Sequence, residues 1–185
     1  MRLRLMVAIV LAATLAACGS EPAAQPPTPE PSWSVDCRVS GEVVPATDFE
    51  GMELPCLGGD ETRQIGVAEG RPLLVTLWAS WCRPCVAEAP ELTEFHRLFG
   101  DRIDVLGVDT QDNSKAARYF AEDVGLTFPS LVDERGDVMR SQGLATLPAT
   151  FLIDGDGDTV ARFTDATLTA DDLIAAVEEH LGMTP

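Results

Sequence analysis

The stretch of sequence that decides the fold is Leu73–Cys85, which reads LLVTLWASWCRPC. It begins with Leu73–Trp78, a continuous run of apolar and β-forming residues that is typical of a strand buried on both faces of a sheet. The pair Cys82 and Cys85 follows, and Pro84 between them suits the first turn of a helix, where its missing N–H would have no partner. The stretch therefore predicts a central strand, a short loop and a helix that begins at the cysteines.

Alternating strands and helices are predicted after this stretch. The apolar periodicity switches between a helical spacing and continuous β-forming runs, and turn or capping residues separate the segments. In order, the pattern predicts a helix over 84–99 with a kink at Pro90, a strand over 103–108, a helix over 112–125 capped by Asp112 or Ser114, a hairpin of strands 149–153 and 159–163, and a last helix capped by Thr169. The strand–helix–strand order indicates a right-handed crossover and an α/β fold.

The Cys-x-x-Cys motif is positioned for redox chemistry. A helix N-terminus offers unpaired N–H groups and a partial positive charge, which should lower the pKa of the Cys82 thiol and favour its thiolate, with help from Arg83. Cys85, one turn later and more buried, would then be the resolving thiol that closes the internal disulfide. The alternatives at this point are a zinc half-site and a purely structural disulfide.

A zinc site requires a second pair of ligands. The other candidate ligands are Cys37, Cys56, His96 and His180, and none of them shows paired spacing. The segment Asp154–Asp158 resembles the start of a calcium loop but lacks the glycine and the final glutamate that such a loop needs, so it indicates a hairpin turn. We therefore expect no metal and no cofactor.

The run Trp78–Pro90, WASWCRPCVAEAP, resembles the thioredoxin superfamily. More narrowly, it is similar to the membrane-anchored, extracytoplasmic thiol:disulfide oxidoreductases of the TlpA-like and ResA-like group. The segments FPSLVD, at 128–133, and LPATFLID, at 147–154, follow in the order that the family has them, and the resemblance covers roughly residues 50–182. It implies a thioredoxin fold, in which a mixed central sheet is flanked by helices, with an N-terminal extension.

The resemblance also implies which residues meet a substrate. Pro148 would be a cis-proline facing the active-site cysteines, and it would hold the backbone of Leu147 ready to pair with an extended substrate segment. Trp81 and Leu147 are thus the expected substrate-binding residues. The alternative is that Pro148 is an ordinary trans proline in a loop.

The sequence departs from cytoplasmic thioredoxins at Thr76. Those proteins carry a buried aspartate at this place, six residues before the first cysteine, and threonine cannot transfer a proton at neutral pH. Glu88, three residues after Cys85, matches the glutamate of the ResA-like proteins and is the expected proton acceptor or donor for the Cys85 thiol, with a pKa raised by burial. The alternative is a solvated glutamate that stabilises the first turn through the helix dipole.

Two further cysteines, Cys37 and Cys56, remain after the catalytic pair and Cys18 are assigned. In an oxidising compartment they are expected to form a structural disulfide, which would pin the N-terminal extension to the domain. Closing a loop of about 20 residues should add ~3 kcal/mol of stability. The alternative is that one of them is a third redox thiol that exchanges with Cys82 or Cys85.

The N-terminus is predicted to be a targeting segment. Arg2 and Arg4 precede an apolar stretch over 5–17, which is too short to span a membrane but typical of a secretory signal. It ends in LAAC at 15–18, which resembles a bacterial lipobox, so 1–17 is the expected signal peptide and Cys18 the expected lipidation site. The alternative is a plain secretory signal that happens to end at a cysteine.

A proline-rich tether is predicted after the lipidation site, over 18–32, because this segment has almost no large apolar side chain. The thioredoxin-like domain then occupies 33–185. The chain has 30 acidic residues against 13 Lys and Arg and a net charge of -17. Such a chain lacks the positive surface that nucleic-acid binding requires, so no nucleic-acid partner is expected.

The expected function is disulfide exchange with exported proteins at the extracytoplasmic face of a bacterial cell membrane. By the resemblance, the substrates would be protein thiols or disulfides, such as apocytochrome c thiols awaiting haem, and a membrane thiol reductant would supply electrons. An oxidant that installs disulfides in secreted proteins would use the same residues. A third hypothesis is a non-catalytic binding lipoprotein in which the Cys82–Cys85 bond is structural.

Overall fold

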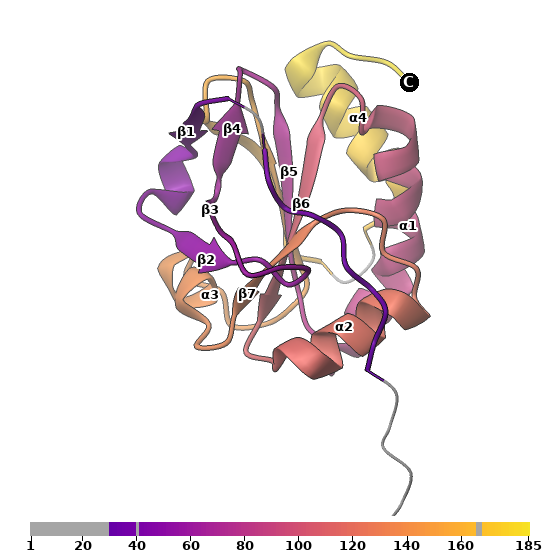
Figure 1. The fold of residues 1–185 in the computed structure, drawn as a ribbon. Helices are drawn as coiled ribbons and strands as arrows, with labels where there is room; N and C mark the ends of the chain where they lie inside the picture. The colour runs from indigo at the N-terminus through magenta and orange to yellow at the C-terminus, as the bar shows by residue number, and fades with distance from the viewer. Residues whose placement is uncertain (1–29, 40, 166–167) are drawn as a thin grey trace, which may run out of the picture. The chain divides into compact units, whose positions relative to one another are not determined.

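A five-stranded mixed sheet forms the centre of the computed structural model, which describes residues 30–39, 41–165 and 168–185 (Figure 1). The strand order is β7-β6-β5-β8-β9, in which β5, β6 and β7 are parallel and β8 and β9 are antiparallel to their neighbours. The strands are β5 Leu73–Trp78, β6 Asp104–Thr110, β7 Ser130–Asp133, β8 Ala149–Ile153 and β9 Thr159–Phe163. The expected mixed sheet and thioredoxin fold are thereby confirmed.

Helices cover the sheet because its strands are apolar on both faces. Leu74 and Val105 point towards a core shared with Phe95 and Leu173, which lies beneath α1 and α4. In Figure 1 these two helices lie on one side of the sheet, and α2 lies below them near the end of β6. The helices are α1 Arg83–Phe99, α2 Ser114–Asp123, α3 Asp137–Ser141 and α4 Ala170–Leu181.

The opposite face of the sheet is covered by α3 and by short elements from the N-terminal part of the chain (Figure 1). Phe49 packs edge-on against Phe151 of β8, with ring centroids 5.2 Å apart, in a second apolar core. The short elements pair as two antiparallel ribbons, β1 with β4 and β2 with β3. Their bounds are β1 Val43–Pro45, a 3₁₀ turn at Thr47–Phe49, β2 Glu53–Pro55, β3 Thr62–Gln64 and β4 Gly66–Ala68.

The N-terminal segment is bound to α2 and the turn that follows it. The indole of Trp33 is buried and donates to the carbonyl of Leu126 at 2.9 Å. The Arg118 guanidinium donates to the carbonyls of Trp33 and Pro31, at 3.0 and 2.9 Å. The compact unit begins at Pro31.

The start of α2 differs from the prediction. Asn113 is its N-cap, and its side chain accepts from the N–H of Ala116 at 2.9 Å, so neither Asp112 nor Ser114 has this role. Asp112 is engaged elsewhere, because its carboxylate accepts from the N–H of Ser80. The predicted cap at Thr169 is confirmed, and a complete capping box is present there.

The predicted signal peptide 1–17, the lipidation site Cys18 and most of the predicted tether lie outside the described residues. Within the described part, no helix has both the length and the apolar composition needed to cross a membrane.

Candidate active site

The Cys82–Cys85 pair lies at the start of α1, shortly after the central strand β5 ends. Cys82 is the N-cap of α1, and its Sγ accepts a hydrogen bond from the main-chain N–H of Cys85 at 3.2 Å. The two residues form a disulfide with their Cα atoms 5.3 Å apart. An N–H donor and the positive end of the helix dipole both act on the first sulfur, which favours a thiolate there after reduction.

Both sulfur-bearing residues are buried in this disulfide form. Cys82 is 4% exposed and Cys85 is 3% exposed, so the two residues are almost equally buried. Two exposed apolar side chains flank them, since Trp81 and Val86 are 56% and 47% exposed, and the exposed Arg83 lies between the two cysteines. Any molecule that reaches the cysteines must therefore approach them between the side chains of Trp81 and Val86.

A narrow, mostly apolar cavity lies beneath the disulfide. Its lining brings together four positions that the sequence singles out, Thr76, Cys85, Glu88 and Pro148. Thr76 is buried, and its hydroxyl oxygen accepts a hydrogen bond from the hydroxyl of Thr150 at 3.0 Å. Because neither threonine titrates, Glu88 is the titratable acid among the residues that line this cavity.

Glu88 lies in the first two turns of α1, and its side chain is buried. Its side chain is only 3% exposed and its Oε1 has no hydrogen-bond partner. Burial raises the pKa of Glu88 to about 7, and a hydrogen bond from the Leu168 main chain opposes this effect. The solvated glutamate considered as an alternative is therefore wrong, because the side chain is buried.

Pro148 follows a cis peptide bond from Leu147. It is buried and contributes to the same cavity as Cys85. It lies directly before β8, whose first residue Ala149 pairs with Leu77 of β5. The alternative of a trans loop proline is therefore wrong. Leu147 is half-buried and packs against both apolar cores.

Two residues that the sequence analysis did not assign to the active site support the loop before Cys82. The Asp112 carboxylate accepts from the N–H of Ser80 at 2.6 Å, and the carbonyl of Gln111 accepts from Nε1 of Trp81 at 3.0 Å. Both residues follow the carboxyl end of β6, which lies beside β5 in the sheet. Their position after a parallel strand was the available signal, because ligand-binding residues collect at that edge of α/β sheets.

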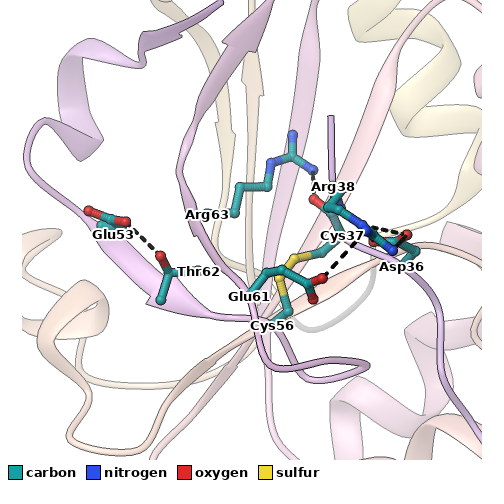
Figure 2. Close-up of a disulfide and its surroundings, with 8 residues drawn as sticks. All are labelled: Asp36, Cys37, Arg38, Glu53, Cys56, Glu61, Thr62 and Arg63. Carbon is teal, nitrogen blue, oxygen red and sulfur yellow. Dashed lines mark hydrogen bonds and ion pairs between the residues drawn. A yellow bond between two sulfur atoms is a disulfide. The ribbon is translucent and has the colours of Figure 1, made fainter. Parts of the chain in front are cut away.

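The second pair, Cys37 and Cys56, is also joined as a disulfide, with a Cα separation of 6.0 Å. Figure 2 shows it between the N-terminal segment and the β2–β3 ribbon, with Arg63 reaching towards the main chain of Cys37. The Arg63 guanidinium is buried, and its Nη1 donates to the Cys37 carbonyl at 3.4 Å. The main chain of Cys56 forms an isolated antiparallel β-bridge with Leu131 of β7, at the edge of the sheet. The Cys82–Cys85 disulfide instead follows the central strand β5.

Metal binding finds no support in the described residues, where no group of three or more His, Cys, Asp and Glu side chains is arranged to hold an ion.

Comparisons with known proteins agree with this geometry. The chain is 32% identical over 136 residues to the thiol-disulfide oxidoreductase ResA of Geobacillus kaustophilus, covering 73% of this chain and 70% of that protein. The crystal structure of a DsbF homologue from Corynebacterium diphtheriae is 27% identical, with a TM-score of 0.61 and coverage of 77% and 90%. StoA from Bacillus subtilis shares the fold, with a TM-score of 0.57, 24% identity and coverage of 69% and 96%. Residues 40–177 match the Redoxin family model, and the chain thus belongs to the redoxin family and is a thiol:disulfide oxidoreductase.

Proposed function

We propose that this enzyme exchanges disulfides with exported proteins at the extracytoplasmic face of a bacterial cell membrane, to which Cys18 anchors it. The observation that carries the proposal is the Cys82–Cys85 disulfide at the N-terminus of α1, flanked by the exposed side chains of Trp81 and Val86. Exposed apolar side chains beside a reactive pair suit the transient binding of a polypeptide.

The reaction follows from the positions of the two sulfurs. In the reductive direction, the Cys82 thiolate attacks one sulfur of a client disulfide, and the other client sulfur leaves as a thiolate that takes up a proton. Glu88 then accepts the Cys85 proton, and the Cys85 sulfur attacks Cys82 in the mixed disulfide. The client leaves as a dithiol, the enzyme retains a disulfide, and a membrane thiol reductant returns two electrons and two protons to it.

A client segment would bind in an extended form beside Cys82. The cis bond before Pro148 fixes the Leu147 main chain at the start of β8, and Pro148 itself has no N–H that would compete for an acceptor. The side chain of Trp81 would cover the client from the other side of the cysteines. By the family resemblance, the clients would include apocytochrome c, whose paired cysteines must be thiols before haem attachment.

The anchor rests on the sequence of the N-terminus. After removal of 1–17, Cys18 would carry the lipid, and the proline-rich tether would lead to the compact unit that begins at Pro31.

The direct test is to trap the clients. A Cys85→Ala variant forms the mixed disulfide and cannot resolve it, so it should accumulate clients linked through Cys82. Cys82→Ala is the matched control and should trap very little. Clients with paired haem-binding cysteines would support the reductive role, whereas equal trapping by both variants would contradict the proposed order of attack.

One observation favours the opposite direction of electron flow. The hydrogen bond from the Cys85 N–H to the Cys82 sulfur and the helix dipole both stabilise a Cys82 thiolate, and a stabilised reduced form makes a pair more oxidising. The second candidate is therefore an oxidant that installs disulfides in secreted proteins. The reduction potential of the pair, measured against glutathione, separates the two, since 30 mV corresponds to ~1.4 kcal/mol.

A further inference from the structure

Asp109 is a fully buried carboxyl that the exchange reaction described above does not use. It lies near the end of β6, in register with Trp78 of β5 on one side and Val132 of β7 on the other. Its side chain is 0% exposed, and no donor group of the described residues hydrogen-bonds to either of its carboxyl oxygens. A hydrogen bond with the side chain of Asp112 is among the causes that raise the pKa of Asp109. An ionised carboxylate without partners is costly to keep away from water, so this position favours the neutral acid.

The groups that face Asp109 strengthen this preference. Burial is the main cause that raises the pKa of Asp109 to about 8, and three neighbouring carboxyl groups add to it. They are Asp112 in the segment after β6, Asp133 at the end of β7, and Glu134 directly after β7. All three neighbours are acidic, so ionisation of Asp109 adds a charge where negative charge is already concentrated.

The segment Asp109–Asp112 also supports the loop that carries Cys82. The Asp112 carboxylate accepts a hydrogen bond from the Ser80 N–H at 2.6 Å. The carbonyl of the preceding residue, Gln111, accepts a hydrogen bond from Nε1 of Trp81 at 3.0 Å. Ser80 and Trp81 are the two residues immediately before Cys82. A displacement of Asp112 would therefore be passed directly to the position of the first catalytic sulfur.

We propose that Asp109 is a positioning residue for the Cys82–Cys85 pair and that it acts through Asp112 and the Ser80 amide. While Asp109 is protonated, Asp112 faces an uncharged neighbour and keeps its hydrogen bond to Ser80. When Asp109 loses its proton, two carboxylates face each other in a site with little water, and their repulsion moves Asp112 away from the Ser80 N–H. The loop before Cys82 then loosens.

Only one consequence of the proposal rests on the proposed exchange function. That consequence is that Cys82 reacts more slowly with clients when Asp109 is ionised. The change in the loop needs no client and is tested in the oxidised protein, in which neither Cys82 nor Cys85 can titrate. A failure of the loop test would leave the exchange function standing, and a protein without exchange activity would still show the loop change.

The first experiment is an NMR titration of the full oxidised protein between about pH 5 and 9.5. It follows the side-chain carboxyl carbon of Asp109 and the amide proton of Ser80. Both signals should move with one shared midpoint near pH 8. A Ser80 amide that stays constant over this range, or that moves with a midpoint different from that of Asp109, would overturn the proposal.

The second experiment removes the titration with Asp109→Asn, which keeps nearly the same shape. Acrylamide quenching of tryptophan fluorescence reports mainly on Trp81, because Trp33 and Trp78 are buried. The unaltered protein should show a rise in quenching through pH 8, which Asp109→Asn should lose. The matched control is Asp101→Asn, an exposed carboxyl at the start of the turn before β6, which should keep the rise.

The outcomes of the second experiment are equally direct. A rise near pH 8 that persists in Asp109→Asn, or that is absent from the unaltered protein, would contradict the proposed role. If Asp109→Asn does not fold, the NMR titration decides the question by itself, since it needs no substitution.

Discussion

Glu88 lies one helical turn after Cys85 on α1, and the two side chains line the same narrow cavity beneath the active-site disulfide. The carboxyl is buried there and has a pKa of about 7, so it can take a proton from a neighbouring thiol and return it near neutral pH. This relationship leads to two predictions about pH.

The first concerns the resolving step. Glu88→Gln keeps the shape of the side chain but cannot titrate, so the attack of Cys85 on the mixed disulfide should slow and its pH dependence should flatten between about pH 5 and 9. Stopped-flow kinetics of mixed-disulfide resolution would measure this. Alkylation of Cys82 by a small reagent is the control and should be nearly unchanged. Identical resolution kinetics in the variant would remove Glu88 from the mechanism.

The second concerns stability. Because the pKa of Glu88 is raised from 4.5 in the unfolded chain to about 7 in the native state, the native state binds more protons between these values, and its stability falls as pH rises from 4.5 to 7. Glu88→Gln should remove this loss, which is at most about 3.5 kcal/mol at about 1.4 kcal/mol per pKa unit. Denaturant unfolding of both oxidised proteins at low and neutral pH would measure it. Equal pH slopes would show that Glu88 is not perturbed.

The third prediction concerns the Cys37–Cys56 disulfide, whose partners are separated by 19 residues in the chain. The double variant Cys37→Ser/Cys56→Ser should lose ~3 kcal/mol of unfolding free energy, because the unfolded chain regains the freedom that the closed loop removes. Denaturant unfolding with the Cys82–Cys85 bond intact would measure the loss.

Differential alkylation with peptide mapping checks the same bond in the unaltered protein. Mild reductant should open Cys82–Cys85 and leave Cys37–Cys56 closed. Two free thiols at Cys37 and Cys56 in protein from the extracytoplasmic space would count against a structural role.

The fourth prediction concerns client binding through Trp81. Trp81→Ala should slow exchange with protein disulfides more than exchange with a small disulfide, because it removes exposed apolar surface beside Cys82. Val44→Ala, at a valine of β1 that is 48% exposed, is the control and should leave both rates unchanged. An equal loss on both substrates would assign Trp81 to the chemistry of the pair and not to client binding.

The fifth prediction concerns the anchor. Cys18→Ala should release the protein from membranes or leave it unprocessed, because the lipid cannot be attached without the thiol. Membrane fractionation and the mass of the mature N-terminus would measure both effects. A Cys18→Ala protein that is processed and membrane-bound like the unaltered chain would rule out lipidation at this residue.

Local patterns in the sequence were sufficient for much of the fold. The strand at 73–78, the hairpin strands at 149–153 and 159–163, and the cap at Thr169 all lie where the sequence predicts them, because each depends on residues that are neighbours in the chain. The strand β7 and the helix α3 were not recognised, since they are short and carry too little periodicity.

The sequence by itself determined the Cys-x-x-Cys pair, its place between a buried strand and a helix, and Glu88 one turn beyond it. Only the tertiary structure decided the properties that depend on distant parts of the chain. The pKa of Glu88 reflects burial and a hydrogen bond from Leu168, and the loop before Cys82 is held by Asp112. Burial and long-range contacts arise when elements pack together, so a pattern of residue types along one segment does not contain them.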